Sequence, residues 1–130
     1  MVVINDTGFG YVVVDGEKIE HDIVILPNGK IIKRRKDISA KYRNMYGHTP
    51  LSRDELKYYL NSIGQDIEFI VIGKGQYGDL PLTPEAKNFL EELKSRGTNV
   101  IIDKTPNIID KLNELYSKGA KTLSIIHVTC

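Results

Sequence analysis

Six residues in the middle of the chain, Gly73-Lys74-Gly75-Gln76-Tyr77-Gly78, form the pattern G-x-G-x-x-G directly after a β-branched run. In dinucleotide-binding proteins this pattern places a pyrophosphate at the N-terminus of a helix that begins at the turn. Here Pro81 prevents a helix from beginning before Thr83, so the required geometry is missing. We therefore expect a glycine-rich turn that lets the chain cross the sheet edge, and no cofactor.

Other residues that could bind a ligand are expected to lie near this turn, because the carboxyl ends of parallel strands share one edge of a sheet. Asp103 ends the next predicted strand, and the helix N-termini lie at the same edge. The candidate ligand-binding residues are Gly73, Lys74, Gly75, Gln76, Gly78, Lys104, Thr105 and His127. Glycine amides, lysines and helix N-termini favour a small anion or a carboxylate. One hypothesis is therefore a small-anion-binding protein or enzyme with its site at this edge.

His127 and Cys130 suggest a base and a nucleophile near the end of the sequence. Residues three positions apart in a strand point to opposite faces, whereas His127 shares a face with Thr129. His21 and His48 have no acidic partner that the sequence places within reach for general acid-base catalysis. We predict no catalytic residue and no metal site, so the sequence favours a protein that is not an enzyme without deciding the question.

A basic segment between Lys30 and Arg43 contains seven Lys and Arg residues, with Asp37 as its one acidic residue. Tyr42 and Tyr46 accompany them, and interleaved basic and aromatic side chains are typical of nucleic-acid surfaces. The candidate basic patch consists of Lys33, Arg34, Arg35, Lys36, Lys41 and Arg43. Charge runs usually face water, so a solvated strand end and loop is the simpler interpretation. An RNA-binding accessory protein is the second alternative function, and nucleic acid is the less favoured kind of partner.

The elements that position these residues change in character along the chain. Residues 1–50 contain β-type runs at 9–14, 17–20, 22–26 and 30–34. Asp15-Gly16 and Pro27-Asn28-Gly29 separate these runs, and such turns between β-branched residues predict hairpins. The first half is therefore expected to be an antiparallel meander that either extends the sheet of the second half or packs on it.

The second half has a helical period interrupted by apolar runs. Ser52-Arg53-Asp54-Glu55 is a capping-box pattern that predicts a helix over 53–63. Thr-Pro pairs at 83–84 and 105–106 predict two more helices, each with a threonine N-cap and a proline at the first position. The predicted strands are the apolar runs 67–72, 100–102 and 123–128. Because they lack alternation, we expect parallel strands buried on both faces.

These elements predict one α/β domain over residues 1–130, a layered β/α/β arrangement with an antiparallel N-terminal meander and a C-terminal β-α-β-α-β parallel sheet. The 130 residues are 41% hydrophobic and 27% charged, which is enough for one core. The net charge of +1 gives no global field for nucleic acid or an anionic membrane. One Cys and three His exclude a disulfide framework and a zinc module. The apolar runs are too short for a membrane helix, so we expect a cytoplasmic protein.

Three segments resemble the Mth-type domain-of-unknown-function family, in particular its archaeal-type branch. They are Val71-Ile72-Gly73-Lys74-Gly75-Gln76, the stretch 105–115, and the ending Ile126-His127-Val128-Thr129-Cys130. The family includes an adipogenesis-associated protein and a mitochondrial complex I assembly factor. The resemblance implies a compact β/α/β domain without an established catalytic activity. It favours a small protein-interaction or assembly-type module, which binds an unknown protein or another copy of itself.

Overall fold

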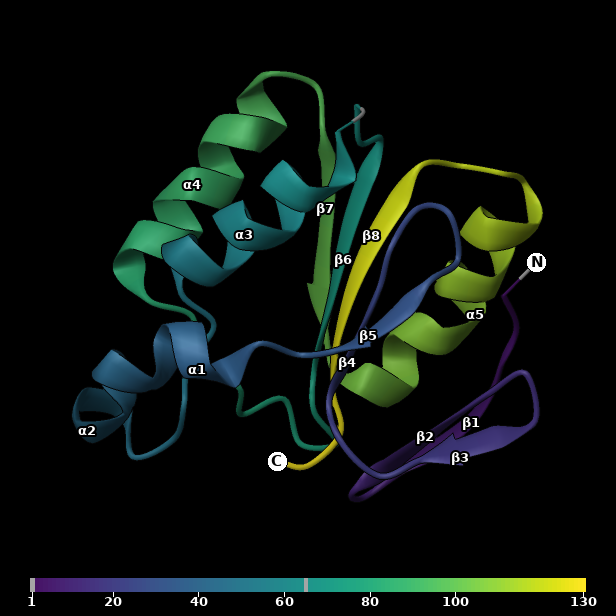
Figure 1. The fold of residues 1–130 in the computed structure, drawn as a ribbon, viewed down its shortest axis with the longest axis horizontal. Coiled ribbons are helices and arrows are strands. Elements are labelled where there is room, and N and C mark those ends of the chain that lie inside the picture. The colour runs from purple at the N-terminus through teal and green to yellow at the C-terminus, as the bar shows by residue number, and fades with distance from the viewer. Residues whose placement is uncertain (1, 65) are drawn as a thin grey trace.

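A five-stranded sheet in the order β5-β4-β8-β6-β7 forms the centre of the computed structural model, which describes residues 2–64 and 66–130 (Figure 1). Strands β6 (Phe69–Lys74), β7 (Asn99–Asp103) and β8 (Thr122–His127) are parallel to one another. The parallel β-α-β-α-β half predicted from the three apolar runs is therefore confirmed.

The predicted meander is divided between two sheets. Strands β4 (Ile23–Ile25) and β5 (Ile31–Lys33) extend the central sheet, with β4 antiparallel to β8. Strands β1 (Ile4–Gly8), β2 (Tyr11–Val14) and β3 (Glu17–Ile19) form a separate antiparallel sheet. Both predicted arrangements thus occur, one for each part of the meander. The Asp-Gly turn between β2 and β3 has the positive φ angles that such hairpins require, 50° and 80°.

The helices α3 (Arg53–Ile63) and α4 (Pro84–Ser95) match the predicted starts. The hydroxyl of Ser52 accepts the N–H of Glu55, and the hydroxyl of Thr83 accepts the N–H of Ala86. Each cap satisfies an amide that the first helical turn leaves without a partner.

Two helical predictions need correction. Helix α5 (Thr105–Ser117) has Lys104 as its N-cap, and no side chain caps it, because the Thr105 hydroxyl accepts the N–H of Gly75 and donates to the His127 carbonyl. The basic segment begins in strand β5, as expected for a strand end, but its later part is helical where a loop was expected. It contains α1 (Lys36–Ser39), the 3₁₀ turn Ala40–Tyr42 and the start of α2 (Arg43–Tyr46), and α1 lies beside α3 in Figure 1.

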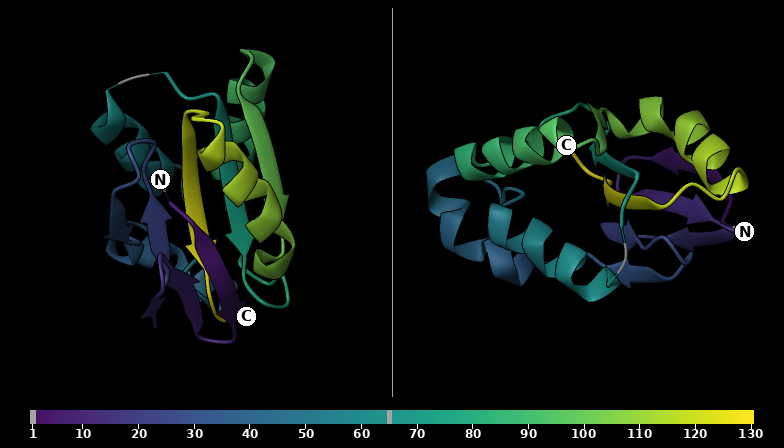
Figure 2. Two further views of the ribbon diagram at one scale, coloured as in Figure 1. Left: turned by 90° about the vertical axis from the view of Figure 1, so that its right-hand side faces the viewer. Right: turned by 90° about the horizontal axis from the view of Figure 1, so that it is seen from above.

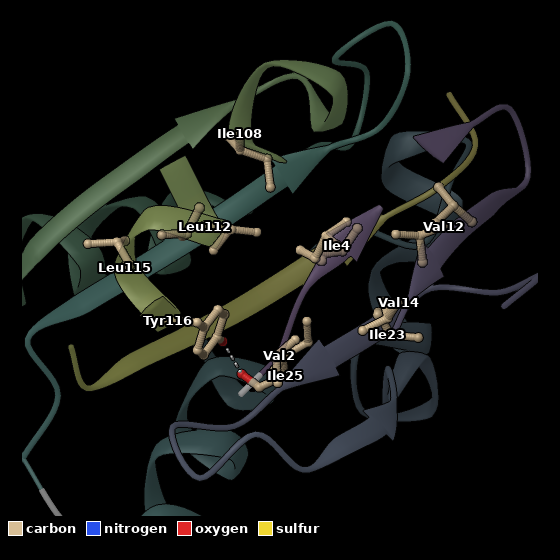
Figure 3. Close-up of a cluster of buried hydrophobic side chains, with 13 residues drawn as sticks. Val2, Ile4, Val12, Val14, Ile23, Ile25, Ile108, Leu112, Leu115 and Tyr116 are labelled. Atoms are coloured by element: carbon tan, nitrogen blue, oxygen red, sulfur yellow. Dashed lines mark hydrogen bonds between the residues drawn. The ribbon is translucent and has the colours of Figure 1, made fainter. Parts of the chain in front are cut away.

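The central sheet is covered differently on its two faces, as the views in Figure 2 show. Helices α3 and α4 cover one face, where Leu56, Leu90, Ile70, Ile72 and Ile125 belong to one buried cluster. Helix α5 and the three-stranded sheet cover the other face. Figure 3 shows this second cluster, in which Ile4, Val12 and Leu112 are buried together. The result is the layered domain predicted from the sequence.

Strand β7 departs from the prediction that all three parallel strands are buried on both faces. It lies at the margin of the sheet, and the side chain of Ile102 is 43% exposed. Ile102 is exposed because β7 is an edge strand, and the order of the strands in the sheet is not contained in the sequence pattern. None of the helices in the described residues has both the length and the apolar character needed to cross a membrane.

Candidate functional site

The amides of the glycine-rich loop that follows β6 are engaged within the protein. The N–H of Gly75 donates to Thr105 Oγ1 at 2.9 Å, and the N–H of Gln76 donates to the Thr129 carbonyl at 2.7 Å. The amides of Tyr77 and Asp79 both donate to the Cys130 carbonyl, at 3.2 and 2.9 Å. The loop is therefore closed by residues 129 and 130, and these amides are not available to an anion.

Gly75 is needed for this closure. Its φ is +96°, and a Cβ at this position would lie 2.4 Å from the Cys130 carbonyl carbon and 2.7 Å from His127 Cδ2. The hydroxyl of Thr105 donates to the His127 carbonyl at 2.6 Å while accepting the Gly75 amide. Thr105 and Gly75 therefore connect three segments of the fold, which agrees with the predicted structural role of the turn.

The remaining residues predicted for an anion site are spread around this closed loop. A Cβ at Gly73 would lie 2.7 Å from Thr105 Oγ1, so this glycine permits close packing of α5 on β6. Gln76 Nε2 donates to Thr7 Oγ1 at 3.1 Å. The alkyl chain of Lys104 lies against Gly78, and Lys74 ends β6. Five surface hollows found among the described residues are lined elsewhere.

Arg34 does not belong to a surface patch, contrary to the prediction for the basic segment. The residue is 3% exposed, and its Nε donates to Glu55 Oε2 at 2.8 Å. Its Nη1 lies 3.2 Å from Asp22 Oδ2, and its Nη2 donates to the Pro50 carbonyl at 2.8 Å. A guanidinium is buried only when its donors are satisfied, and here two carboxylates and a carbonyl satisfy them.

Three further side chains of the segment are paired with carboxylates. Lys36 Nζ lies 3.4 Å from Asp22 Oδ2, and the exposed pairs Arg35–Asp37 and Lys41–Asp54 have N–O distances of 2.8 and 2.9 Å. Lys33 and Arg43 are exposed. The patch is therefore less positive than its sequence indicates, because acidic neighbours offset much of its charge.

Asp22 is a buried carboxylate that the sequence interpretation did not include among the candidate site residues. The carboxylate is 2% exposed; Oδ2 lies 2.7 Å from His127 Nδ1, and Oδ1 accepts the N–H of Val128 at 2.9 Å. Burial raises the pKa of Asp22. This effect is smaller than the opposite one of its partners, which are the hydrogen bond and charge of His127, the Val128 amide and Lys36. Together they hold the pKa of Asp22 well below its usual range. His127 thus has an acidic partner, contributed from 105 positions earlier in the chain.

Glu55 extends this buried polar centre. Its carboxylate accepts hydrogen bonds from Arg34, from Ser39 Oγ at 2.6 Å and from the Tyr59 hydroxyl at 2.6 Å. Burial raises the pKa of Tyr59, and the nearby Glu55 carboxylate adds to the effect. The fully connected network indicates that the centre anchors α1 and α3 to β4. Every buried side-chain nitrogen or oxygen in the described part of the chain has a hydrogen-bond partner.

The four sheet edges differ in how far they are protected. At the β1 edge, the Asn113 side chain accepts the N–H of Ile4 at 2.7 Å and donates to its carbonyl at 2.9 Å. The edge strands β3 and β5 are three residues long and carry the charged residues Glu17, Lys18 and Lys33. Short strands and charges are common means of protecting an edge. The β7 edge is longer, with five residues, and its centre Val100-Ile101-Ile102 is apolar, because its one charged residue, Asp103, lies at the end of the strand.

The outward backbone groups of β7 follow from its pairing with β6. The N–H of Asn99 donates to the Glu68 carbonyl at 2.9 Å, so the N–H and C=O groups of residues 99, 101 and 103 face β6. Successive residues in a strand present these groups to alternate sides, so the groups of Val100 and Ile102 face away from the sheet. Their side chains, with Leu90, line a hollow of about 370 Å³ between α4 and the edge.

The family model described as "Protein of unknown function (DUF498/DUF598)" matches residues 4–127. The chain belongs to this family. Among solved structures, the DUF498/DUF598 protein is similar to the conserved hypothetical protein PH1505 from Pyrococcus horikoshii OT3, with 38% identity, 98% coverage of each chain and a TM-score of 0.79. It is also similar to MT938, with 30% identity, 100% coverage of each chain and a TM-score of 0.76.

A more distant structure shares the fold of this DUF498/DUF598 chain. A Bordetella pertussis protein, described as a Mth938-like domain, is 21% identical with a TM-score of 0.52, over 97% of this chain and 85% of that one. The Mth-type resemblance read from the sequence is therefore confirmed. No curated protein matches the chain.

Proposed function

We propose that this DUF498/DUF598 protein is an interaction module that binds an extended polypeptide segment along the open edge of β7. One observation carries the proposal: the backbone N–H and C=O groups of Val100 and Ile102 face away from β6 at an edge whose centre is apolar and uncharged. Domains that take up a partner strand use such groups for affinity and the neighbouring side-chain pockets for specificity.

The side chains around the edge support the same function. Val100, Ile102 and Leu90 form an apolar centre in the hollow beside β7. The polar residues Lys87, Glu91 and Lys94 of α4 surround it. An apolar centre with a polar rim is the ordinary composition of a protein interface.

The two alternative functions have less support from the geometry. Small-anion binding at the carboxyl edge was expected to use loop amides, and those of residues 75–77 and 79 donate to other groups of the protein. RNA binding was expected to use a continuous basic surface, and Arg34 is buried while Arg35, Lys36 and Lys41 are paired with carboxylates.

The test compares two proline variants that each remove one outward N–H from a sheet edge. Ile102→Pro alters the β7 edge. Lys33→Pro is the matched control on β5, where the N–H of Arg34 donates to Asp22 and the N–H of Lys33 therefore faces outward. Circular dichroism first establishes that both variants are folded. We expect a protein captured from a native extract by the wild type to be retained by Lys33→Pro and lost with Ile102→Pro. Retention of the same protein by all three would contradict binding at β7.

A further inference from the structure

We propose that the occupant of the β7 edge is β7 of a second copy of this chain, paired antiparallel about a two-fold axis at Ile101. This inference rests on the proposed function, because it names the partner of the same edge. In an isologous pairing the same surface is used by both copies, so a self-complementary strand is required. The sequence Asn99-Val100-Ile101-Ile102-Asp103 meets that requirement in one particular register.

The backbone of β7 fits this register. A two-fold axis at Ile101 places Val100 opposite Ile102 of the other copy, and Ile102 opposite Val100. These are the two residues whose N–H and C=O groups face outward. Each such pair exchanges two hydrogen bonds, so the register makes all the outward groups of residues 100 and 102 into an antiparallel ladder. Ile101 then faces its own copy in the pair without hydrogen bonds at the centre.

The side chains fit the same register on both faces of the sheet. Val100 packs with the cluster under α3 and α4, and Ile102 lines the hollow on that side, so Val100 of each copy meets Ile102 of the other there. Ile101 packs with the cluster under α5 on the opposite face and meets Ile101 of the second copy. At the ends, the amide of Asn99 lies opposite the carboxylate of Asp103. Apolar residues thus face apolar residues, and cross-strand pairs of β-branched side chains stabilise antiparallel strands.

The charges of α4 are compatible with a second copy. Lys87 and Lys94 flank Glu91 by about one helical turn on either side, along the hollow beside β7. The two-fold axis makes the two α4 helices antiparallel, so each helix presents a row that carries charges of both signs. Strand pairing at about 4.8 Å carries the two sheets into one continuous sheet of ten strands. The pairing is closed, because each copy uses its β7 edge once and its other outer strand, β5, is short and charged.

The first test is the mass of the protein in solution by sedimentation equilibrium over a range of concentrations. We expect the wild type to reach twice the mass of one chain. Ile102→Pro removes one outward N–H from each copy and is expected to raise the dissociation constant by about tenfold or more. Ile102→Lys places a charge at the apolar centre of the edge and is expected to give a monomer. Lys33→Pro, at the opposite edge, is expected to keep the dissociation constant of the wild type.

The second test fixes the register by disulfide formation in a Cys130→Ser background. Ile101→Cys faces its own copy at a Cα separation of about 4.5 Å, which lies within the range that a disulfide spans. Ile102→Cys alone lies roughly 8 Å from its own copy and is expected to remain reduced. Val100→Cys with Ile102→Cys in one chain is expected to cross-link again.

The outcomes separate this inference from the proposed function. A wild type that is monomeric at all concentrations overturns the second copy, while capture of another protein by the β7 edge would still support the interaction module. A dimer that survives Ile102→Lys, or one in which Ile102→Cys cross-links and Ile101→Cys does not, overturns the pairing described here.

Discussion

His127 Nδ1 lies 2.7 Å from Asp22 Oδ2, although 105 positions separate the two residues in the chain. The other oxygen of the same carboxylate accepts the Val128 amide, and Arg34 and Lys36 approach Oδ2. Asp22 therefore joins the end of β8 to the start of β4 and to the basic segment. This carboxylate is buried and charged, so its partners determine how the stability of the protein depends on pH.

Stability is expected to fall at acid pH because of Asp22. The pKa of Asp22 in the folded protein is held well below the ordinary value of 3.8. The ionised carboxylate therefore contributes to the free energy of unfolding above pH 3.8, and this contribution is lost as the pH falls from 3.8 toward the pKa of the folded protein. Urea unfolding at a series of values from about pH 5 to about pH 2 measures this dependence. We expect a steeper loss in the wild type than in Asp22→Asn. Equal slopes would show that the pKa of Asp22 is not lowered.

Glu55→Gln is expected to destabilise the protein strongly. The variant removes the charge that faces Arg34 Nε at 2.8 Å, and the guanidinium stays buried. Removing one partner of a buried pair typically costs about 3–5 kcal/mol in the free energy of unfolding. The matched control is Asp54→Asn, one position earlier on the surface, where the exposed pair with Lys41 contributes little. Similar urea midpoints for the two variants would contradict the central role of Glu55.

Gly75→Ala is expected to destabilise the protein by about 3 kcal/mol. The added Cβ meets Cys130 and His127 at distances that no side chain tolerates, and the backbone has a φ of +96°. Gly16→Ala is the control, because Gly16 also has a positive φ of 80° and nothing lies within 4 Å of the place that its Cβ would occupy. That variant is expected to cost only about 1 kcal/mol. Thermal unfolding of both variants measures the difference due to packing.

The amides of Gly75, Gln76, Tyr77 and Asp79 are expected to exchange slowly with deuterated solvent. Each donates to Thr105, Thr129 or Cys130, so exchange requires the loop to open. Addition of phosphate is expected to leave their chemical shifts unchanged. Fast exchange together with phosphate-dependent shifts would instead support the small-anion site predicted from the glycine pattern.

Local signals predicted the local elements. Ser52, the apolar period behind it and Gly64 define α3 within a few positions, so its bounds follow from the sequence. Strand β1 was missed because Ile4-Asn5-Asp6-Thr7-Gly8 contains one apolar residue, and its edge is held by Asn113 from α5. The sequence around β1 carries no sign of a partner so far along the chain.

Most of the candidate site is formed by contacts between residues that lie far apart in the sequence. Arg34 was placed in a surface patch because its neighbours are basic, but Asp22 and Glu55, 12 and 21 positions away, enclose it. Glu55 matched a capping box, and its side chain instead bonds to Arg34, Ser39 and Tyr59. The open edge at β7 likewise depends on the order of the strands, which no local pattern in Asn99–Asp103 contains.

The central place of β8 has a consequence for the synthesis of the chain. This strand is the last in the sequence, yet it lies between β4 and β6 and joins the N-terminal strands to the parallel strands. Until residues 122–127 have left the ribosome, β4 and β5 have no place in the sheet, and the earlier segments expose apolar surface. The sheet of the nascent domain is therefore completed only after residues 122–127 have been synthesised, and the earlier segments rely until then on protection from aggregation.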